Sequence, residues 1–175
     1  MARRRARPKS HSRLGKIFEG EVSQSLRAMK EKLGISFFSC RLHDTMAYLR
    51  TPNVILPKQP FDYFAVCNGI AFGIEAKSMH VPRFDLEHIP EHQKNGLKDI
   101  EFAGGKGFLL FSFREIKPVS CYACPINAFT QLEFRAKAEG RKSLPQDWIV
   151  EVSKEIRRIP RNGWNLEPLF LDIEQ

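Results

Sequence analysis

The sequence predicts an α/β domain in which helices flank a central mixed β-sheet. The chain of 175 residues is long enough for one domain with its own core and short for two. Helix-like and strand-like patterns alternate along the chain, which is typical of a sheet covered by helices. Two strand-like runs are separated by Asn68-Gly69, the strongest short signal for a β-hairpin. Together these features predict a mixed sheet.

Composition and charge place the chain among ordinary soluble proteins. Hydrophobic residues make up 42% and charged residues 27%, which is usual for a globular domain. The longest apolar run, at residues 108–111, is too short to cross a bilayer and is soon followed by Arg114 and Glu115. The basic N-terminus has no apolar segment behind it and does not resemble a secretory signal. We therefore expect a cytoplasmic protein with no membrane partner.

The positive charge is concentrated at the N-terminus. The formal net charge is +8, and residues 1–16 hold seven basic residues and no acid, which leaves +1 for the rest of the chain. The seven are Arg3, Arg4, Arg5, Arg7, Lys9, Arg13 and Lys16. We expect residues 1–16 to form a flexible basic arm that binds DNA phosphates, and residues 17–175 to form a single folded domain. A merely solubilising tail is the alternative.

The first predicted element is a helix over residues 15–33. Its apolar residues recur every three or four positions, and Gly34 follows the last of them. They are Phe18, Val22, Leu26, Met29 and Leu33. Residues 37–42 mix aromatic and aliphatic side chains and predict a short strand. The proline-bounded stretch 51–60 predicts an irregular connection.

The hairpin follows, with strands over residues 61–67 and 70–77. In a two-residue hairpin around Asn68-Gly69, Asp62 lies opposite Glu75. Directly opposed residues have Cβ atoms roughly 4.5–5.5 Å apart. Because side chains alternate along a strand, Glu75, Lys77 and Asp62 share one face, while the other face is apolar and predicted to be core. A polar group on an otherwise apolar element indicates a functional site.

The second half of the chain continues the alternation. Residues 81–86 predict a loop or short strand, and residues 107–113 form a nearly continuous apolar run that predicts a buried strand. The remaining expected elements are a helix at 90–102 ended by Gly104-Gly105, a strand at 119–124, a helix at 125–139 closed by Gly140, and a short helix at 146–151.

Two carboxylates as close as Asp62 and Glu75 invite a divalent cation. Hard oxygen ligands suit Mg²⁺ or Mn²⁺, and such an ion beside Lys77 can activate water and stabilise charge on a phosphate. Glu19, next to the core residue Phe18 on the first helix, could reach the same metal. The alternatives are an exposed strand end where Lys77 pairs with a carboxylate, and a solvated Glu19.

Cysteine and histidine residues leave two zinc sites to consider. Cys121 and Cys124 could join Cys40 and His43 in a tetrahedral site, although simple packing of reduced cysteines is the favoured interpretation. The second candidate is His88 with His92, four positions apart, but Pro90 lies between them and interrupts a helix.

Several motifs resemble a known family when they are taken in order. Pro60-Phe61-Asp62, twelve residues, then Glu75-Ala76-Lys77 resembles the P-D…(D/E)-x-K pattern of the restriction-endonuclease-like nuclease superfamily. Further matches are Gly15-Lys-Ile-Phe18-Glu19, Phe84-Asp-Leu86, Ile89-Pro-Glu-His92-Gln93 and Gly107 to Phe113. Over roughly residues 13–115 the chain resembles Holliday junction resolvases of the RecU type, found in bacteria and some of their phages.

The resemblance implies a restriction-endonuclease-like fold and a homodimer that cuts four-way DNA junctions with Mg²⁺ or Mn²⁺ in recombination and repair. By position, Asp62 and Glu75 resemble metal ligands, Lys77 the catalytic lysine and Glu19 the helix glutamate of the site. Gln93 after His92 resembles an H-Q pair near the scissile phosphate. A bacterial cytoplasm, or the host cytoplasm of a phage, is the implied location.

The chain departs from the family in one place. The family has a longer projection before the catalytic hairpin, where it engages the junction centre, whereas only the stretch around residues 50–58 is available here. Junction selectivity is therefore less firmly implied than nuclease chemistry. Another site-specific or repair endonuclease of the superfamily, or a non-catalytic DNA-binding protein, remains an alternative.

Overall fold

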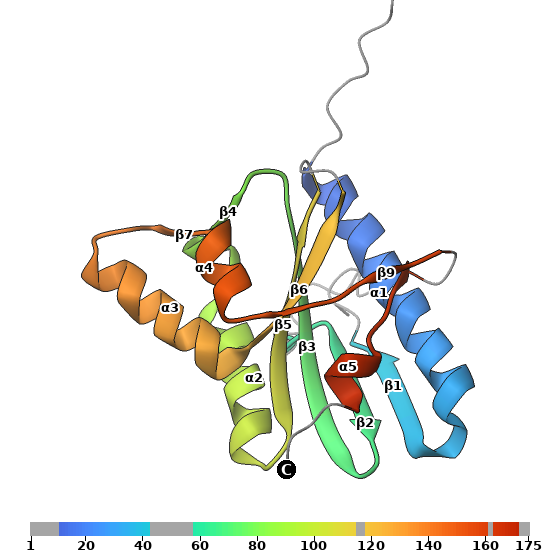
Figure 1. The fold of residues 1–175 in the computed structure, drawn as a ribbon. Helices are drawn as coiled ribbons and strands as arrows, with labels where there is room; N and C mark the ends of the chain where they lie inside the picture. The colour runs from blue at the N-terminus through green and yellow to red at the C-terminus, as the bar shows by residue number, and fades with distance from the viewer. Residues whose placement is uncertain (1–10, 43–57, 115–117, 161–162, 172–175) are drawn as a thin grey trace, which may run out of the picture.

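A six-stranded sheet forms the centre of the molecule in the computed structural model, which describes residues 11–42, 58–114, 118–160 and 163–171 (Figure 1). The strand order is β1-β2-β3-β5-β6-β8. The strands are β1 (Phe37–Arg41), β2 (Tyr63–Cys67), β3 (Ile70–Met79), β5 (Lys106–Phe113), β6 (Ser120–Pro125) and β8 (Lys154–Glu155). Only β3 and β5 pair in parallel within this sheet, so the predicted mixed sheet is confirmed.

Helices and short strands surround the sheet. The helices are α1 (His11–Leu33), α2 (Glu91–Phe102), α3 (Ile126–Ala138), α4 (Gln146–Glu151) and α5 (Glu167–Phe170), with 3-10 turns η1 (Gly34–Ser36) and η3 (Leu86–His88). Two small antiparallel pairs join β4 (Arg83–Asp85) to β7 (Ser143–Pro145), and β9 (Arg158–Ile159) to β10 (Gly163–Trp164). None of the described helices is long and apolar enough to span a membrane.

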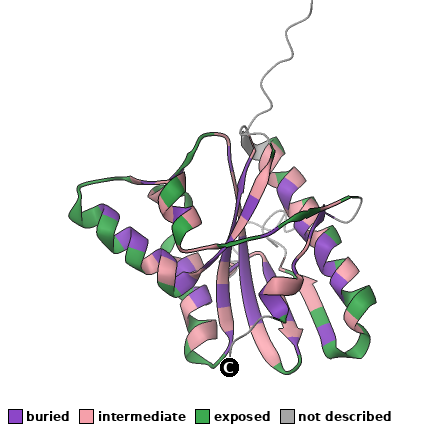
Figure 2. Cartoon of the chain, viewed as in Figure 1, coloured by how far each residue is buried: buried purple, intermediate pink, exposed green. Residues whose placement is uncertain are grey.

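The sheet is buried on both faces by different elements. On one face, which we call the α1 face, α1 and the C-terminal segment pack over β2 and β3, with Phe18, Phe72 and Phe170 in the core. On the other, the α2 face, α2 and α3 pack over β3 and β5 around Leu97 and Phe129. Figure 2 shows buried residues along the strands and on the inner side of α1. Each strand of the hairpin therefore contributes to two cores.

α1 begins four residues before the predicted start, at His11. Leu14 lies four positions before Phe18 and continues the apolar spacing of the helix, and Arg and Lys are good helix formers. Arg13 and Lys16 of the expected arm consequently lie on a helix. Residues 1–10 of that arm are outside the described part of the chain, as is most of the expected connection at 51–60.

A cluster of charges ties α1 to the C-terminal segment. Glu21 accepts hydrogen bonds from Arg114 at 2.5 Å, from Arg158 at 3.0 Å and from the Trp164 indole at 3.1 Å. Burial opposes ionisation of Glu21, yet these donors hold its pKa below the ordinary value. A half-buried ion network of this kind helps to orient α1 relative to the sheet.

The hairpin forms with the predicted register. Tyr63 pairs with Ile74 and Cys67 with Ile70, and both turn residues have positive φ, 48° at Asn68 and 82° at Gly69. These angles match the turn type that Asn-Gly favours. β2 begins at Tyr63, so Asp62 lies just before the strand instead of inside it.

The other predicted elements are present within a few residues of their expected bounds, but the C-terminal third is richer than expected. Only the helix at 146–151 was predicted after Ser143, whereas β7 to β10 and α5 are also formed. These segments are two to four residues long, and β7 and β8 pair with the distant strands β4 and β6. Such short elements leave no local periodicity to detect.

Candidate active site

Asp62 is held in place by backbone contacts on both sides. One carboxylate oxygen accepts the N–H of Ala76 on β3 at 2.9 Å, and its carbonyl accepts the N–H of Leu42 after β1 at 2.8 Å. Continuing the β2–β3 register by one residue sets Asp62 against Glu75. The predicted facing of these two carboxylates therefore follows from the observed register.

Glu75 is buried on the α2 face of β3. It is 1% exposed, and Lys77 Nζ lies 2.7 Å from its Oε1. Its second oxygen, Oε2, is buried and has no hydrogen-bond partner among the described residues. Burial, together with the charge of Asp62, raises the pKa of Glu75 to about 7, although Lys77 and the backbone N–H of Asp62 oppose this. An unpaired oxygen on a buried glutamate is an acceptor that a bound cation would satisfy.

Lys77 connects the hairpin to α2. Its amine donates to Gln93 Oε1 at 3.0 Å in addition to pairing with Glu75. Gln93 is in the first turn of α2, whose start is set by Pro90 at the N-cap. The lysine side chain is 17% exposed. The structure thus brings Lys77 into contact with Gln93, and the motif resemblance named both residues.

The position of α2 depends on two residues that the sequence analysis did not identify. A Cβ on Gly96 would lie 2.4 Å from Cβ and 2.8 Å from the carbonyl oxygen of Pro60, so only glycine allows this close approach. Lys94, 4% exposed, donates to Glu133 of α3 at 2.7 Å. A lone glycine within a helical pattern often marks close packing, and that signal could have identified Gly96.

Glu19 projects from α1 and has a different partner, although its charge acts on Asp62. Its carboxylate forms an ion pair with Arg41 on β1, and its backbone carbonyl accepts the Tyr63 hydroxyl at 2.6 Å. Among the described residues, no group of three or more His, Cys, Asp or Glu side chains lies close enough to hold a metal ion. Asp62, Glu75, Lys77 and Gln93 are gathered, while Glu19 stands apart from them in its ion pair.

Asp62 shares the electrostatic environment of Glu75. Burial raises its pKa above the ordinary value and the charge of Glu19 adds to this, against the opposing effects of the Ala76 N–H and Lys77. Two neighbouring carboxylates with raised pKa values would both be favoured as anions by a bound divalent cation. Their hard oxygen atoms, with the unpaired Oε2, fit Mg²⁺ or Mn²⁺.

The cysteines are packing residues. Cys121 and Cys124 are three positions apart on β6 and therefore point to opposite faces, Cys121 into the α1-face core and Cys124 into the α2-face core. Burial raises the pKa of Cys124 to about 11. They cannot share one metal ion, which confirms the packing interpretation. His43 is outside the described residues, and His88 belongs to no metal-binding group within them.

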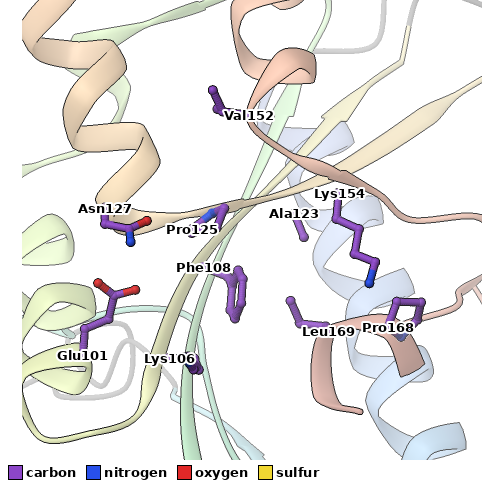
Figure 3. A pocket seen from close by; sticks show the side chains of 10 residues that line it. All are labelled: Glu101, Lys106, Phe108, Ala123, Pro125, Asn127, Val152, Lys154, Pro168 and Leu169. Carbon is purple, nitrogen blue, oxygen red and sulfur yellow. The ribbon is translucent and has the colours of Figure 1, made fainter. Parts of the chain in front are cut away.

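A cavity near the end of α2 is separate from these residues. It measures about 370 Å³ and is bounded by the end of α2, β5, β6 and α5 (Figure 3). Phe108 and Ala123, which line it, pack on the α1-face core, whereas Glu75 points to the opposite face. None of the predicted site residues lines this cavity, so cavity size does not identify the active site here.

A mixed sheet with Asp62, Glu75 and Lys77 on its hairpin defines a protein of the P-D…(D/E)-x-K class. The family model described as RecU, Recombination protein U, matches residues 30–162, which is most of the chain. The chain belongs to this family. Family membership confirms the resemblance drawn from the motifs and, with the observed sheet, the restriction-endonuclease-like fold class.

Individual relatives extend the comparison. The Holliday junction resolvase RecU of Staphylococcus carnosus (strain TM300) is 31% identical over 115 residues, which are 65% of this chain and 50% of that protein. The chain thus spans about half the length of the curated relative it matches. Among solved structures, Hjc, a Holliday junction resolvase of Archaeoglobus fulgidus, is similar with a TM-score of 0.49 and 15% identity, covering 81% of this chain and 95% of that one.

Proposed function

We propose that this protein is a metal-dependent endonuclease that resolves four-way DNA junctions in recombination and repair, acting as a homodimer so that two sites cut two strands. The observation that carries the proposal is the buried Glu75, whose Oε2 has no partner among the described residues, beside Asp62 and Lys77. The name of the curated relative supports the junction as the substrate.

Asp62 and Glu75 would hold the metal ion, and Mg²⁺ or Mn²⁺ fits their hard oxygen donors. When bound, such an ion lowers the pKa of a water molecule and stabilises charge on a phosphate. Glu19 is proposed as a further ligand, one that must exchange its ion pair with Arg41 for the metal.

The chain's own groups would orient the reaction. The Ala76 N–H fixes one oxygen of Asp62 and so orients the carboxylate. Lys77 is proposed to donate a hydrogen bond to the attacking water or to the phosphate oxygen on which charge develops. Gln93 accepts from the lysine and limits its rotamers. Groups held in advance in this way stabilise developing charge without reorganising during the reaction.

DNA affinity beyond the cut site is assigned to the N-terminal basic residues. Each Lys or Arg placed on a phosphate releases counterions and adds affinity that does not depend on sequence. The proposed contacts are Arg3, Arg4, Arg5, Arg7, Lys9, Arg13 and Lys16. The location proposed for the protein is the cytoplasm of a bacterium or of a phage's host.

The decisive experiment compares a synthetic four-way junction with a linear duplex of the same arm sequences. We expect the wild type to cut the junction in Mg²⁺, and Asp62→Asn and Lys77→Ala to lower kcat by about a thousandfold, as removal of one oriented group can. Asp85→Asn is a matched control, because that carboxylate pairs only with exposed Arg83 at 3.4 Å.

Each alternative function has its own outcome in this experiment. Equal cutting of the duplex would remove the junction as the preferred substrate. Cuts at one sequence in linear duplex would favour a site-specific endonuclease. Junction binding without cleavage in any divalent ion would favour a non-catalytic DNA-binding protein and contradict the proposal.

A further inference from the structure

A second cavity opens on the α1 face, between α1, β1 and β2. Its volume is about 260 Å³. The polar residues that line it are Ser23, Arg27, Ser39, Arg41 and Tyr63. Among the described residues, no aspartate or glutamate lines it. The cavity therefore offers positive charge and hydroxyl groups, which are the donors that an anion requires.

Two arginines dominate the electrostatics of the cavity. Arg27 is exposed on α1 and has no carboxylate partner among the described residues. Arg41 lies with its guanidinium carbon 5.9 Å from the centre of the Tyr63 ring and uses one nitrogen for Glu19, which leaves other N–H groups available. Planar guanidinium groups bind phosphate oxygens in pairs of hydrogen bonds, so arginine suits this ligand better than lysine does.

Hydroxyl groups add directed hydrogen bonding to this charge. The hydroxyls of Ser23 and Tyr63 lie 3.1 Å apart, and the Tyr63 hydroxyl also donates to the carbonyl of Glu19. This contact fixes the tyrosine ring against α1. Ser39, on the same strand as Arg41, supplies a further hydroxyl at the wall of the cavity.

The cavity lies at the same ends of β1 and β2 as Asp62, although the side chains of Tyr63 and Asp62 point to opposite faces of the sheet. Tyr63 directly follows Asp62, and it pairs with Arg41 in the β1–β2 register. The next residue of that segment, Leu42, donates its N–H to the Asp62 carbonyl. A DNA strand carries a phosphate at every nucleotide, about 3.4 Å apart along the helix axis. The charges of Arg41 and of its partner Glu19 both act on the Asp62 carboxylate. A phosphate next to the one at Asp62 is therefore within reach of Arg41 at the cavity.

We propose that this cavity binds a backbone phosphate of the DNA strand that is cut, next to the phosphate at Asp62 and Glu75. Arg27 is the main contact, and Arg41 is the second contact once Glu19 exchanges their ion pair for the metal. The inference rests on the proposed nuclease function and adds a second phosphate position to it. Its role is in binding and alignment of the strand, not in the chemical step.

The first test is Arg27→Ala. Loss of one phosphate contact should weaken junction binding by roughly fivefold and reduce the salt dependence of binding by about one counterion, with kcat within about twofold of the wild type. Arg141→Ala is the matched control, because Arg141 is 52% exposed and pairs with Glu139 beyond the end of α3. Equal effects of the two substitutions would overturn the proposal.

The second test uses the substitution Ser39→Cys as a reporter that does not depend on catalysis. Ser39 shares a face of β1 with Arg41 and lines the cavity, whereas Cys40 points to the other face of the strand and is replaced by alanine in this variant. Because Cys67, Cys121 and Cys124 are buried, a maleimide should label position 39 first in the native protein. Saturating junction DNA in the presence of a chelator should slow this labelling several-fold, and the same DNA concentration should protect Arg27→Ala less.

The outcomes separate this inference from the function on which it rests. An unchanged labelling rate at position 39 at saturating DNA, in a protein that still cuts junctions, would overturn the cavity proposal and leave the nuclease function intact. Protection by inorganic phosphate at the concentration of the DNA phosphates would assign the cavity to free phosphate instead of a strand. A protein that neither binds nor cuts DNA would overturn both.

Discussion

The two faces of the sheet hold their polar residues in different ways. On the α2 face, Lys77 contacts Gln93 directly, and Gly96 packs against the backbone of Pro60 with no space for a side chain. On the α1 face, Glu19 is paired with Arg41 beside a cavity. The α2 face fixes groups through close packing, whereas the α1 face presents charge to a ligand. We therefore expect chemistry to depend mainly on the α2 face and strand binding on the α1 face.

Gly96→Ala should have the largest effect on the chemistry that we assign to the α2 face. The added Cβ meets Pro60 backbone atoms at 2.8 and 2.9 Å, so α2 or the segment leading to Asp62 must move. Overpacking of this kind costs about 1–3 kcal/mol. A displacement of about 1 Å lowers kcat roughly a hundredfold. Junction cleavage under saturating DNA and thermal unfolding measure the two effects.

Gly20→Ala on α1 is the control for that substitution. A Cβ at Gly20 would have nothing within 4 Å, so alanine should preserve activity and stabilise the helix by up to about 1 kcal/mol. If Gly96→Ala lost stability but kept its full kcat, the position of α2 would not matter for the chemistry.

Glu75→Gln should separate function from stability in the metal-free protein. Because the pKa of Glu75 is raised from 4.5 to about 7, the folded state binds a proton in that pH range that the unfolded chain does not bind. The contribution of Glu75 to stability therefore falls as pH rises from 4.5 to 7. The raised pKa corresponds to roughly 3 kcal/mol at most. Glutamine cannot ionise, so it removes the free-energy cost of a buried charge at this position, and the variant should melt higher than wild type at pH 8. It should also be inactive, because it lacks the carboxylate proposed to hold the metal.

The same comparison at pH 4.5 is the internal control, because both proteins are then uncharged at this position and the difference in melting temperature should shrink. A variant that melts lower than wild type at pH 8 in a chelator would show that ionised Glu75 does not strain the metal-free fold.

Glu19→Gln should have a smaller effect, because Glu19 is held by Arg41 and is not grouped with Asp62 and Glu75. As an added ligand it should raise the Mg²⁺ concentration for half-maximal cleavage by about tenfold while kcat at saturating Mg²⁺ changes little. Titration of cleavage against Mg²⁺ measures this. A loss of kcat as large as that of Asp62→Asn would place Glu19 at the centre of the site.

Removal of residues 1–10 should affect chemistry least. The deletion takes away five of the seven basic residues expected to bind DNA and leaves α1 intact from His11. Junction binding should become weaker and less dependent on salt, with cleavage retained at saturating protein. Cleavage assays at two salt concentrations test this, and loss of all cleavage would mean that the arm belongs to the active site.

Local signals predicted the hairpin and failed for contacts between distant elements. Asn68-Gly69 and the alternation of side chains determine the register, because both act over a few residues. The contact of Lys77 with Gln93 depends on where α2 packs. That position is set by the close approach of Gly96 to Pro60 and by the ion pair of Lys94 with Glu133. No local pattern encodes that placement, and only the motif resemblance indicated Gln93.

Contacts between distant elements also explain why the partner of Glu19 and the short C-terminal elements were not predicted from the sequence. Helical spacing placed Glu19 beside the core residue Phe18, but its pairing with Arg41 depends on how α1 crosses β1. Trp164 and Phe170 fill the α1-face core from segments of two and four residues. Such segments are ordered by tertiary packing, which overrides weak local propensity.

Binding of Mn²⁺ to the DNA-free protein tests the central claim most directly. We expect wild type to bind Mn²⁺, and Glu75→Gln to lose this binding. Glu101→Gln should retain it, since Glu101 is another partly buried glutamate whose pKa is raised by burial but lies at the far end of α2. Unchanged Mn²⁺ binding in Glu75→Gln, or equal loss in both variants, would contradict a metal centre at Asp62 and Glu75.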